Sequence, residues 1–124
     1  MKKKLLFLLL ISLIFTACDK DEMNTFVKVT VKESSNLQSG VSVYMFSDKK
    51  GPNTPFFIPF YSDKTVITET NGIATFNLQE TFDLDIIDSQ TTLYFGVFGS
   101  NDQVKGSSAV TIEKGQTKTI VIEY

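Results

Sequence analysis

The fold is decided by the stretch Phe26-Val27-Lys28-Val29-Thr30-Val31-Lys32, in which apolar and polar residues alternate. Successive side chains of a β-strand point to opposite faces, so this pattern predicts a strand with one buried and one solvated face. The valines of this stretch would face a core, while Lys28, Thr30 and Lys32 would face water.

Further segments with a period of two follow along the chain, separated by Gly-, Asn- and Ser-containing turns. They are residues 41–46, 65–70, 73–78, 92–98, 105–112 and 117–123. We therefore predict an all-β fold, an antiparallel β-sandwich of about seven strands, preceded by a cleaved signal peptide. The expected inward positions are Val27, Val29, Val31, Val43, Met45, Ile67, Phe76, Leu78, Leu93, Phe95, Val97, Val110, Ile112, Ile120 and Ile122.

Two segments are less regular. Asn71-Gly72 tolerates positive φ at both positions and predicts a hairpin between residues 65–70 and 73–78. Residues 56–61 are apolar but contain Pro59, which lacks a ladder donor, so they predict an edge strand or a packed loop.

The start of the chain has the layout of a secretory signal. Met1–Lys4 is basic, Leu5–Phe15 is apolar, and Thr16-Ala17 precedes the sole cysteine, Cys18. The arrangement resembles a bacterial lipoprotein lipobox, with Phe15 where Leu is usual. The resemblance implies that residues 1–17 are removed and that Cys18 carries lipid. An uncleaved membrane anchor and an unlipidated cysteine are the alternatives, although a span needs roughly 20 apolar residues.

Residues 18–24 then form an expected lipidated acidic tether before a domain at residues 25–124. Its Asp19-Lys20-Asp21-Glu22 resembles the Lys-plus-acidic tag of lipoproteins delivered to the outer face of some Gram-negative cells. A solvated acidic tether is the alternative. We expect a lipid anchor in the outer membrane, with surface display favoured over the periplasmic face.

The composition of the chain excludes several classes of function. Residues 1–17 hold three of the 12 basic residues and none of the 14 acidic ones, so residues 18–124 carry nine lysines and a net charge of −5. This acidic balance, with no arginine, makes nucleic acid an improbable partner. The absence of histidine excludes a Ser-His-Asp triad and His-ligated metal. We expect no catalytic residue, no metal and no cofactor.

Two polar patterns are weaker site candidates. The carboxylates in residues 83–88 alternate but lack the glycine and downstream glutamate of a calcium loop, which favours a solvated acidic face. Lys105 and Ser107 would share a strand face as a Ser-Lys pair, but no residues indicate an oxyanion hole beside them.

A second resemblance covers about residues 25–124. The segments Ser39–Tyr44, Thr68–Phe76 and Glu113–Thr117 are similar to the second strand, the Asn-Gly hairpin and the last turn of transthyretin-like, carboxypeptidase-regulatory-like domains. The resemblance implies a β-sandwich that serves mostly as a non-catalytic spacer, docking or accessory module. The family does not predict the aromatic insertion at residues 52–61.

That insertion is the best candidate site. Phe56, Phe57, Phe60 and Tyr61 cluster there, and four aromatics fall on the outward phase of their strands: Tyr44, Phe46, Tyr94 and Phe98. Exposed together, they would form an apolar patch that contacts a partner protein or a sugar face. Alternatively, and this is the arrangement we favour, the insertion folds back over the outward aromatics as a small second core.

The sequence thus predicts a membrane-anchored envelope lipoprotein that is a non-catalytic binding or accessory module with a protein partner. The alternatives are a purely structural spacer or assembly subunit of a cell-surface complex, and a glycan-binding accessory protein. Cys18 is the predicted lipidation site.

Overall fold

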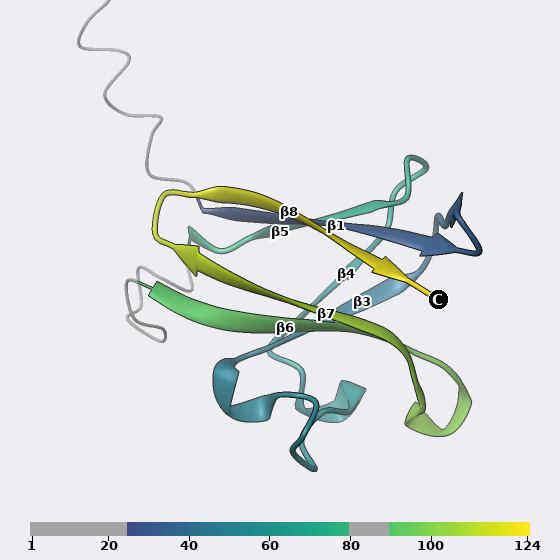
Figure 1. The fold of residues 1–124 in the computed structure, drawn as a ribbon, viewed down its shortest axis with the longest axis horizontal. Helices are drawn as coiled ribbons and strands as arrows, with labels where there is room; N and C mark the ends of the chain where they lie inside the picture. Colours follow the sequence, from purple (N-terminus) through teal and green to yellow (C-terminus); the bar gives the residue numbers. More distant parts are fainter. Residues whose placement is uncertain (1–24, 80–89) are drawn as a thin grey trace, which may run out of the picture.

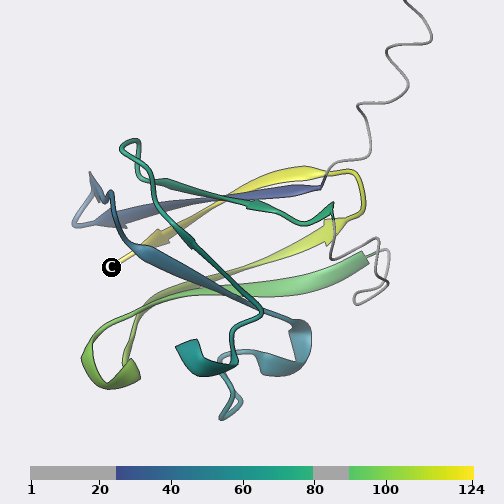
Figure 2. The same ribbon diagram turned by 180° about the vertical axis from the view of Figure 1, so that it is seen from behind.

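The computed structural model describes residues 25–79 and 90–124. The predicted signal peptide, Cys18, the tether and the acidic residues 83–88 lie outside the described residues. Two β-sheets pack face to face (Figures 1 and 2), and the predicted β-sandwich is confirmed.

Sheet A is built around β1 (Phe26–Glu33). This strand pairs antiparallel with β5 (Ile73–Asn77) and with the short β2 (Asn36–Leu37), and parallel with β8 (Thr117–Glu123). The parallel pair corrects the expectation of a wholly antiparallel sandwich. Because β8 reaches sheet A from the other sheet, no tight turn forces it to run opposite to β1.

Sheet B has the strand order β4-β3-β6-β7. Its members are β3 (Ser42–Phe46), β4 (Lys64–Ile67), β6 (Gln90–Phe98) and β7 (Val104–Glu113), and every pair is antiparallel. Short 3₁₀ turns stand in the loops: η1 (Asp48–Lys50), η2 (Pro59–Tyr61) and η3 (Ser100–Asp102). The Pro59 segment is therefore part of a loop and not an edge strand.

The core lies between the sheets and follows the predicted alternation closely. Val27, Val29 and Val31 are fully buried, as are Phe76 and Phe95, whose ring centroids lie 5.0 Å apart. One predicted core residue is wrong: Ile67 is 58% exposed. Val66 instead packs against the core, since it pairs with Val43, while Ile67 pairs with Ser42 in the opposite phase.

The Asn71-Gly72 turn forms, but the predicted hairpin does not. Gly72 N donates to Glu69 O at 2.9 Å, and Glu69 N donates to Ile73 O at 3.0 Å. Beyond this turn the chain separates, because β4 pairs with β3 in sheet B and β5 pairs with β1 in sheet A. The turn is thus a corner that carries the chain between sheets.

A buried hydroxyl supports this corner. Thr68 is 4% exposed. Its Oγ1 donates a hydrogen bond to Gln38 O at 2.6 Å and accepts one from Val41 N at 3.0 Å. Thr68 thereby joins the end of β4 to the loop that enters β3.

The first described residue is also fixed. Thr25 is fully buried, its Oγ1 accepts from Gly115 N at 2.8 Å, and its carbonyl accepts from Leu78 N at 2.8 Å. The domain therefore begins at the end of the sandwich that carries the β7–β8 turn, where β1 starts in Figure 1.

Candidate functional site

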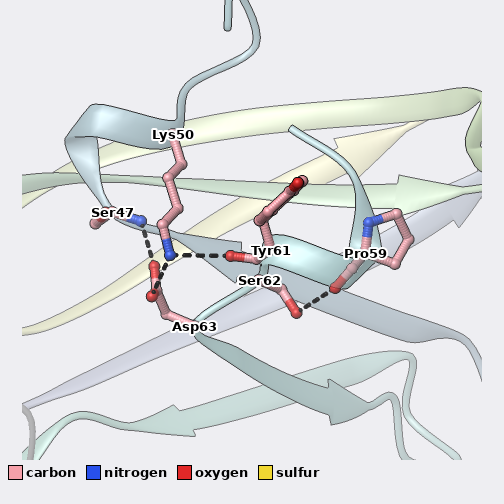
Figure 3. Close-up of polar contacts among 6 residues, drawn as sticks. All are labelled: Ser47, Lys50, Pro59, Tyr61, Ser62 and Asp63. Atoms are coloured by element: carbon pink, nitrogen blue, oxygen red, sulfur yellow. Dashed lines mark hydrogen bonds and ion pairs between the residues drawn. The ribbon is translucent and has the colours of Figure 1, made fainter. Parts of the chain in front are cut away.

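A long loop at residues 47–63, which we call the aromatic loop, crosses the outer face of sheet B between β3 and β4. Its base is closed by Asp63, whose carboxylate accepts from Ser47 N and from Lys50 Nζ, both at 2.9 Å (Figure 3). Asp63 N also donates to Met45 O at 2.8 Å, which anchors this base to β3. One carboxylate thus holds the two ends of the loop together.

Within the loop, polar side chains bond the local backbone. Lys50 Nζ donates to Tyr61 O at 3.1 Å, Ser62 Oγ to Pro59 O at 2.8 Å, and Thr54 Oγ1 to Gly51 O at 2.8 Å. These bonds give the loop its own internal support.

Phe57 inserts from this loop onto the sheet. It is 5% exposed, and its ring centroid lies 4.6 Å from that of Phe46 and 5.4 Å from that of Phe98. Phe46 itself is fully buried, although it lies on the outer face of sheet B. The structure corrects the expectation that Phe46 and Phe57 are exposed contact residues, because each covers the other.

Glycines make room for this packing. A Cβ on Gly96, a buried residue of β6, would lie 3.0 Å from Phe57 Cζ and 2.8 Å from Phe98 Cε1. A Cβ on Gly51 would lie 3.0 Å from Cε2 of the half-buried Tyr94. A glycine in a strand marks such close approach, and Gly96 was the sequence signal that could have revealed the packed ring.

Tyr44 completes the packed group. It is half-buried, and its ring meets Phe98 edge-on at a centroid distance of 5.6 Å. The second core anticipated for the outer face therefore exists, formed by Tyr44, Phe46, Phe57, Tyr94 and Phe98.

The remaining three aromatics of the loop face solvent. Phe56 is 44% exposed, Phe60 83% and Tyr61 39%. The Tyr61 ring is edge-on to both others, with centroids 5.3 Å from Phe56 and 5.0 Å from Phe60. We call these three residues the aromatic knob. The insertion is thus divided, with Phe57 packed and its neighbours exposed, a division that neither sequence alternative contained.

A β-bulge interrupts the strand alternation between Lys105 and Ser107. The β6–β7 register jumps from Val97–Gly106 to Phe98–Val104, which leaves Lys105 as the extra residue of a bulge. Its Nζ lies 4.7 Å from the centroid of the Tyr124 ring, a cation–π contact.

Other site types are not evident in the described ranges. Residues 25–79 and 90–124 contain no cluster of three or more side chains suited to hold a metal ion. Over the same residues no helix is long and apolar enough to cross a membrane.

No protein family model matches the chain, and no curated protein matches it. Among solved structures, the chain is similar to the C-terminal domain of the Caf1A usher, with 11% identity, a TM-score of 0.37, and 79% of this chain and 96% of that chain covered. Conserved hydrophobic clusters on the surface of that domain are important for F1 antigen assembly.

The chain is also similar to catechol 1,2-dioxygenase from Pseudomonas arvilla C-1, with 10% identity and a TM-score of 0.39. The match covers 84% of this chain and 53% of the dioxygenase chain, about half its length. Neither similarity is strong enough to support an inference about the function of this chain.

Proposed function

We propose that this chain is a lipid-anchored lipoprotein of the outer membrane that acts as a non-catalytic binding or accessory module. The aromatic knob is its contact surface. The observation that carries the proposal is the joint exposure of Phe56, Phe60 and Tyr61 on one self-supported loop. Displaying three large rings in water is unfavourable, and exposed apolar groups of this kind mark interaction sites.

The anchor is inferred from the signal-like residues 1–17 and from Cys18. A tether of residues 18–24 spans at most about 25 Å and enters the domain at Thr25. The aromatic loop lies below β6 in Figure 1, on the side of the molecule away from sheet A. A partner would therefore reach the knob from the flank of the anchored domain.

Ring geometry favours a protein partner over a glycan. The plane of Tyr61 makes 84° with that of Phe56 and 89° with that of Phe60. A flat sugar face stacks best on a flat platform of rings, and these three do not form one. A projecting ring such as Phe60 suits a pocket in a protein, where a few aromatic residues often dominate affinity.

The transthyretin-like assignment belongs to the same proposal. It is supported by the turn before the last strand, in which Gln116 N donates to Glu113 O at 3.1 Å. The chain also reverses at Asn71-Gly72, although the flanking strands do not pair as the family's hairpin. Domains of that family mostly serve as docking or accessory modules, as proposed here.

Mass spectrometry of the native protein tests the anchor. We expect a polypeptide that begins at Cys18 with attached acyl chains, and a Cys18→Ser variant that moves to the soluble fraction. An intact Met1 terminus, or a mature chain without fatty acid, would contradict the lipid anchor.

Co-purification from detergent extracts tests the knob. A Phe56→Ser/Phe60→Ser variant should lose the protein partner that the parent chain captures. Val121→Ser is the matched control, since Val121 is 48% exposed and lies on β8 of the other sheet. Phe57 is left intact because it is buried.

Each result separates the candidates. Loss of the partner in the knob variant alone, with an unchanged unfolding curve, supports the proposal. Capture that survives in the knob variant rejects the knob and favours the structural spacer or assembly subunit. Binding of the Cys18→Ser chain to a polysaccharide array, lost in the knob variant, favours the glycan-binding alternative.

A further inference from the structure

We propose that the outer edge of β7 is a pairing surface for a second copy of this chain, and that Lys118 keeps this edge closed. The occupant is the β7 strand of the second copy, in antiparallel orientation. Removal of the Lys118 ammonium group should therefore turn the monomer into a dimer. The proposal requires neither the lipid anchor nor the aromatic knob, so it stands apart from the proposed function.

The outer edge of β7 carries backbone groups that no strand uses. In the described part of the chain, β7 is the last strand of sheet B and pairs only with β6. The Thr111 carbonyl faces the other side, because it accepts a hydrogen bond from Lys118 Nζ of β8, at 2.5 Å. Alternate residues of a strand point their backbone groups the same way, so Ser107 and Ala109 face this edge too. All three are exposed residues, and they form an open ladder.

Lys118 stands at a position where alternation predicts an apolar residue. It shares the inward phase of β8 with the half-buried Ile120 and the fully buried Ile122, and it pairs with the buried Val27. From there its ammonium group crosses the open side of the sandwich to the Thr111 carbonyl of the other sheet. A charged residue that points inward on an edge strand is one of the ways in which β proteins prevent edge-to-edge pairing.

The same arrangement recurs on the opposite side of the sandwich. Lys64 lies on β4, the other outer strand of sheet B, in phase with Val66 and paired with the buried Met45. Its Nζ donates to Asn77 O of β5, an outer strand of sheet A, at 2.6 Å. Each lysine thus joins an outer strand of one sheet to a carbonyl of the other sheet. Two independent occurrences indicate that the charge protects sandwich edges.

The sequence of β7 is complementary to itself, which favours a second copy as the occupant. A two-fold axis at Ala109 would pair Ser107 with Thr111 and would place Lys105, the bulge residue, opposite Glu113. Small uncharged residues then meet at the centre and opposite charges at the ends, which are favourable cross-strand pairs. β7 is also the better edge for pairing, since it has ten residues and β5 has five.

The Lys118 ammonium group opposes this pairing in two ways. It occupies the Thr111 carbonyl, which an incoming strand needs as a hydrogen-bond acceptor. A second strand on this edge would also cover the charge and remove its water, which is costly for an ion without a new partner. A neutral side chain at this position removes both obstacles.

The experiment measures self-association of the chain carrying Cys18→Ser by analytical ultracentrifugation over a series of protein concentrations. Lys118→Met is added to this background, because it keeps the length of the side chain and removes the charge. Lys28→Met is the matched control, since Lys28 is exposed on the outer face of β1, the central strand of sheet A. Amide hydrogen exchange locates the interface.

Lys118→Met should form dimers at protein concentrations at least about tenfold below those at which the background does so. In the dimer, the amides of Ser107, Ala109 and Thr111 should exchange at least about tenfold more slowly. Lys28→Met should behave like the background. Addition of Ala109→Lys to Lys118→Met should restore the monomer, because two like charges would then meet at the axis.

Equal self-association of Lys118→Met and Lys28→Met would overturn the proposal. A dimer that survives Ala109→Lys, or that leaves the exchange of the three β7 amides unchanged, would overturn it as well. If Lys118→Met does not fold, Lys118→Gln takes its place in the same comparisons, since it also removes the charge.

Discussion

Phe57 and Phe60 stand three positions apart in one aromatic segment, yet the first is 5% exposed and the second 83%. Residue type and spacing do not distinguish them. The difference arises because Phe57 packs over Gly96, which has no side chain, whereas Phe60 lies in the middle of the exposed turn η2.

This contrast predicts unequal effects on stability. Phe57→Ala should lower the free energy of unfolding by about 3 kcal/mol, since it removes a buried ring and leaves a cavity. Phe60→Ala should change it by less than about 0.5 kcal/mol. Urea denaturation measures both values, and equal losses would contradict the assigned burial.

The structural role of Thr68 cannot be recognised from the sequence. A β-branched residue is typical of a strand, so the sequence suggests no special role. In the structure, the Thr68 hydroxyl bonds Val41 N and Gln38 O, two backbone groups of another loop. Such a contact between distant segments has no local signal.

Thr68→Val should therefore destabilise the domain by about 1–3 kcal/mol, because the isosteric side chain leaves the part-buried Val41 N–H and Gln38 carbonyl without this partner. Thr65→Val is the control, at an exposed position of β4, the strand that directly precedes Thr68. Thermal unfolding should separate the two variants, and matching melting temperatures would refute the role given to the Thr68 hydroxyl.

At the scale of elements, the sequence predicted where most strands lie and which face of each is buried. Alternation sets the two faces of a strand, so Val27, Val29 and Val31 were placed correctly. It does not say whether the outer face is later covered, which is why the sequence left both an exposed and a covered Phe46 open. It also allowed either phase in residues 64–67, and the choice of Ile67 over Val66 was wrong.

Turn chemistry has a similar limit. Asn71-Gly72 predicts a reversal of the chain, and the reversal is present. Which strands pair beyond it depends on the hydrogen-bonding partners available in each sheet, namely β3 for β4 and β1 for β5. The same local sequence is therefore compatible with a hairpin and with a corner between two sheets.

Two glycines allow this corner to be tested. Gly72 has φ of 75°, and a Cβ there would lie 3.0 Å from Leu37 Cβ; Gly40 has φ of 72° and nothing within 4 Å. Both Gly→Ala variants carry the cost of a left-handed backbone, about 1 kcal/mol. Gly72→Ala should lose about 1 kcal/mol more through the steric contact. Chemical denaturation that finds Gly40→Ala the less stable variant would contradict this account.

At the scale of the whole molecule, the predicted two-layer sandwich was confirmed, whereas the direction of β8 was not foreseen. Parallel pairing joins segments 91 positions apart in register, Phe26 with Thr117, and no short-range pattern encodes such a pairing. The candidate contact residues on the aromatic loop were identified from composition, but their division into packed and exposed rings required the fold.

The position of β8 makes it essential to the whole domain. It covers one side of β1 over the full length of β8 and contributes the fully buried Ile122. Truncation after Gln116 should abolish cooperative unfolding, because the hydrophobic core loses one wall and β1 is left with a bare edge. Near-UV circular dichroism tests this, with Val121→Ser as the folded control. A truncated chain that retains a sharp transition would show that β8 is dispensable.

The chain enters at the start of β1, and β1 is flanked on both sides, by β5 and by β8. A pull on Thr25 would act along the axis of β1, whereas the hydrogen bonds to both neighbours run across that axis. The two ladders would then carry the load together in shear and fail at once, instead of parting one bond after another like a zip. A domain pulled from this end would resist tension through two strand pairings at once.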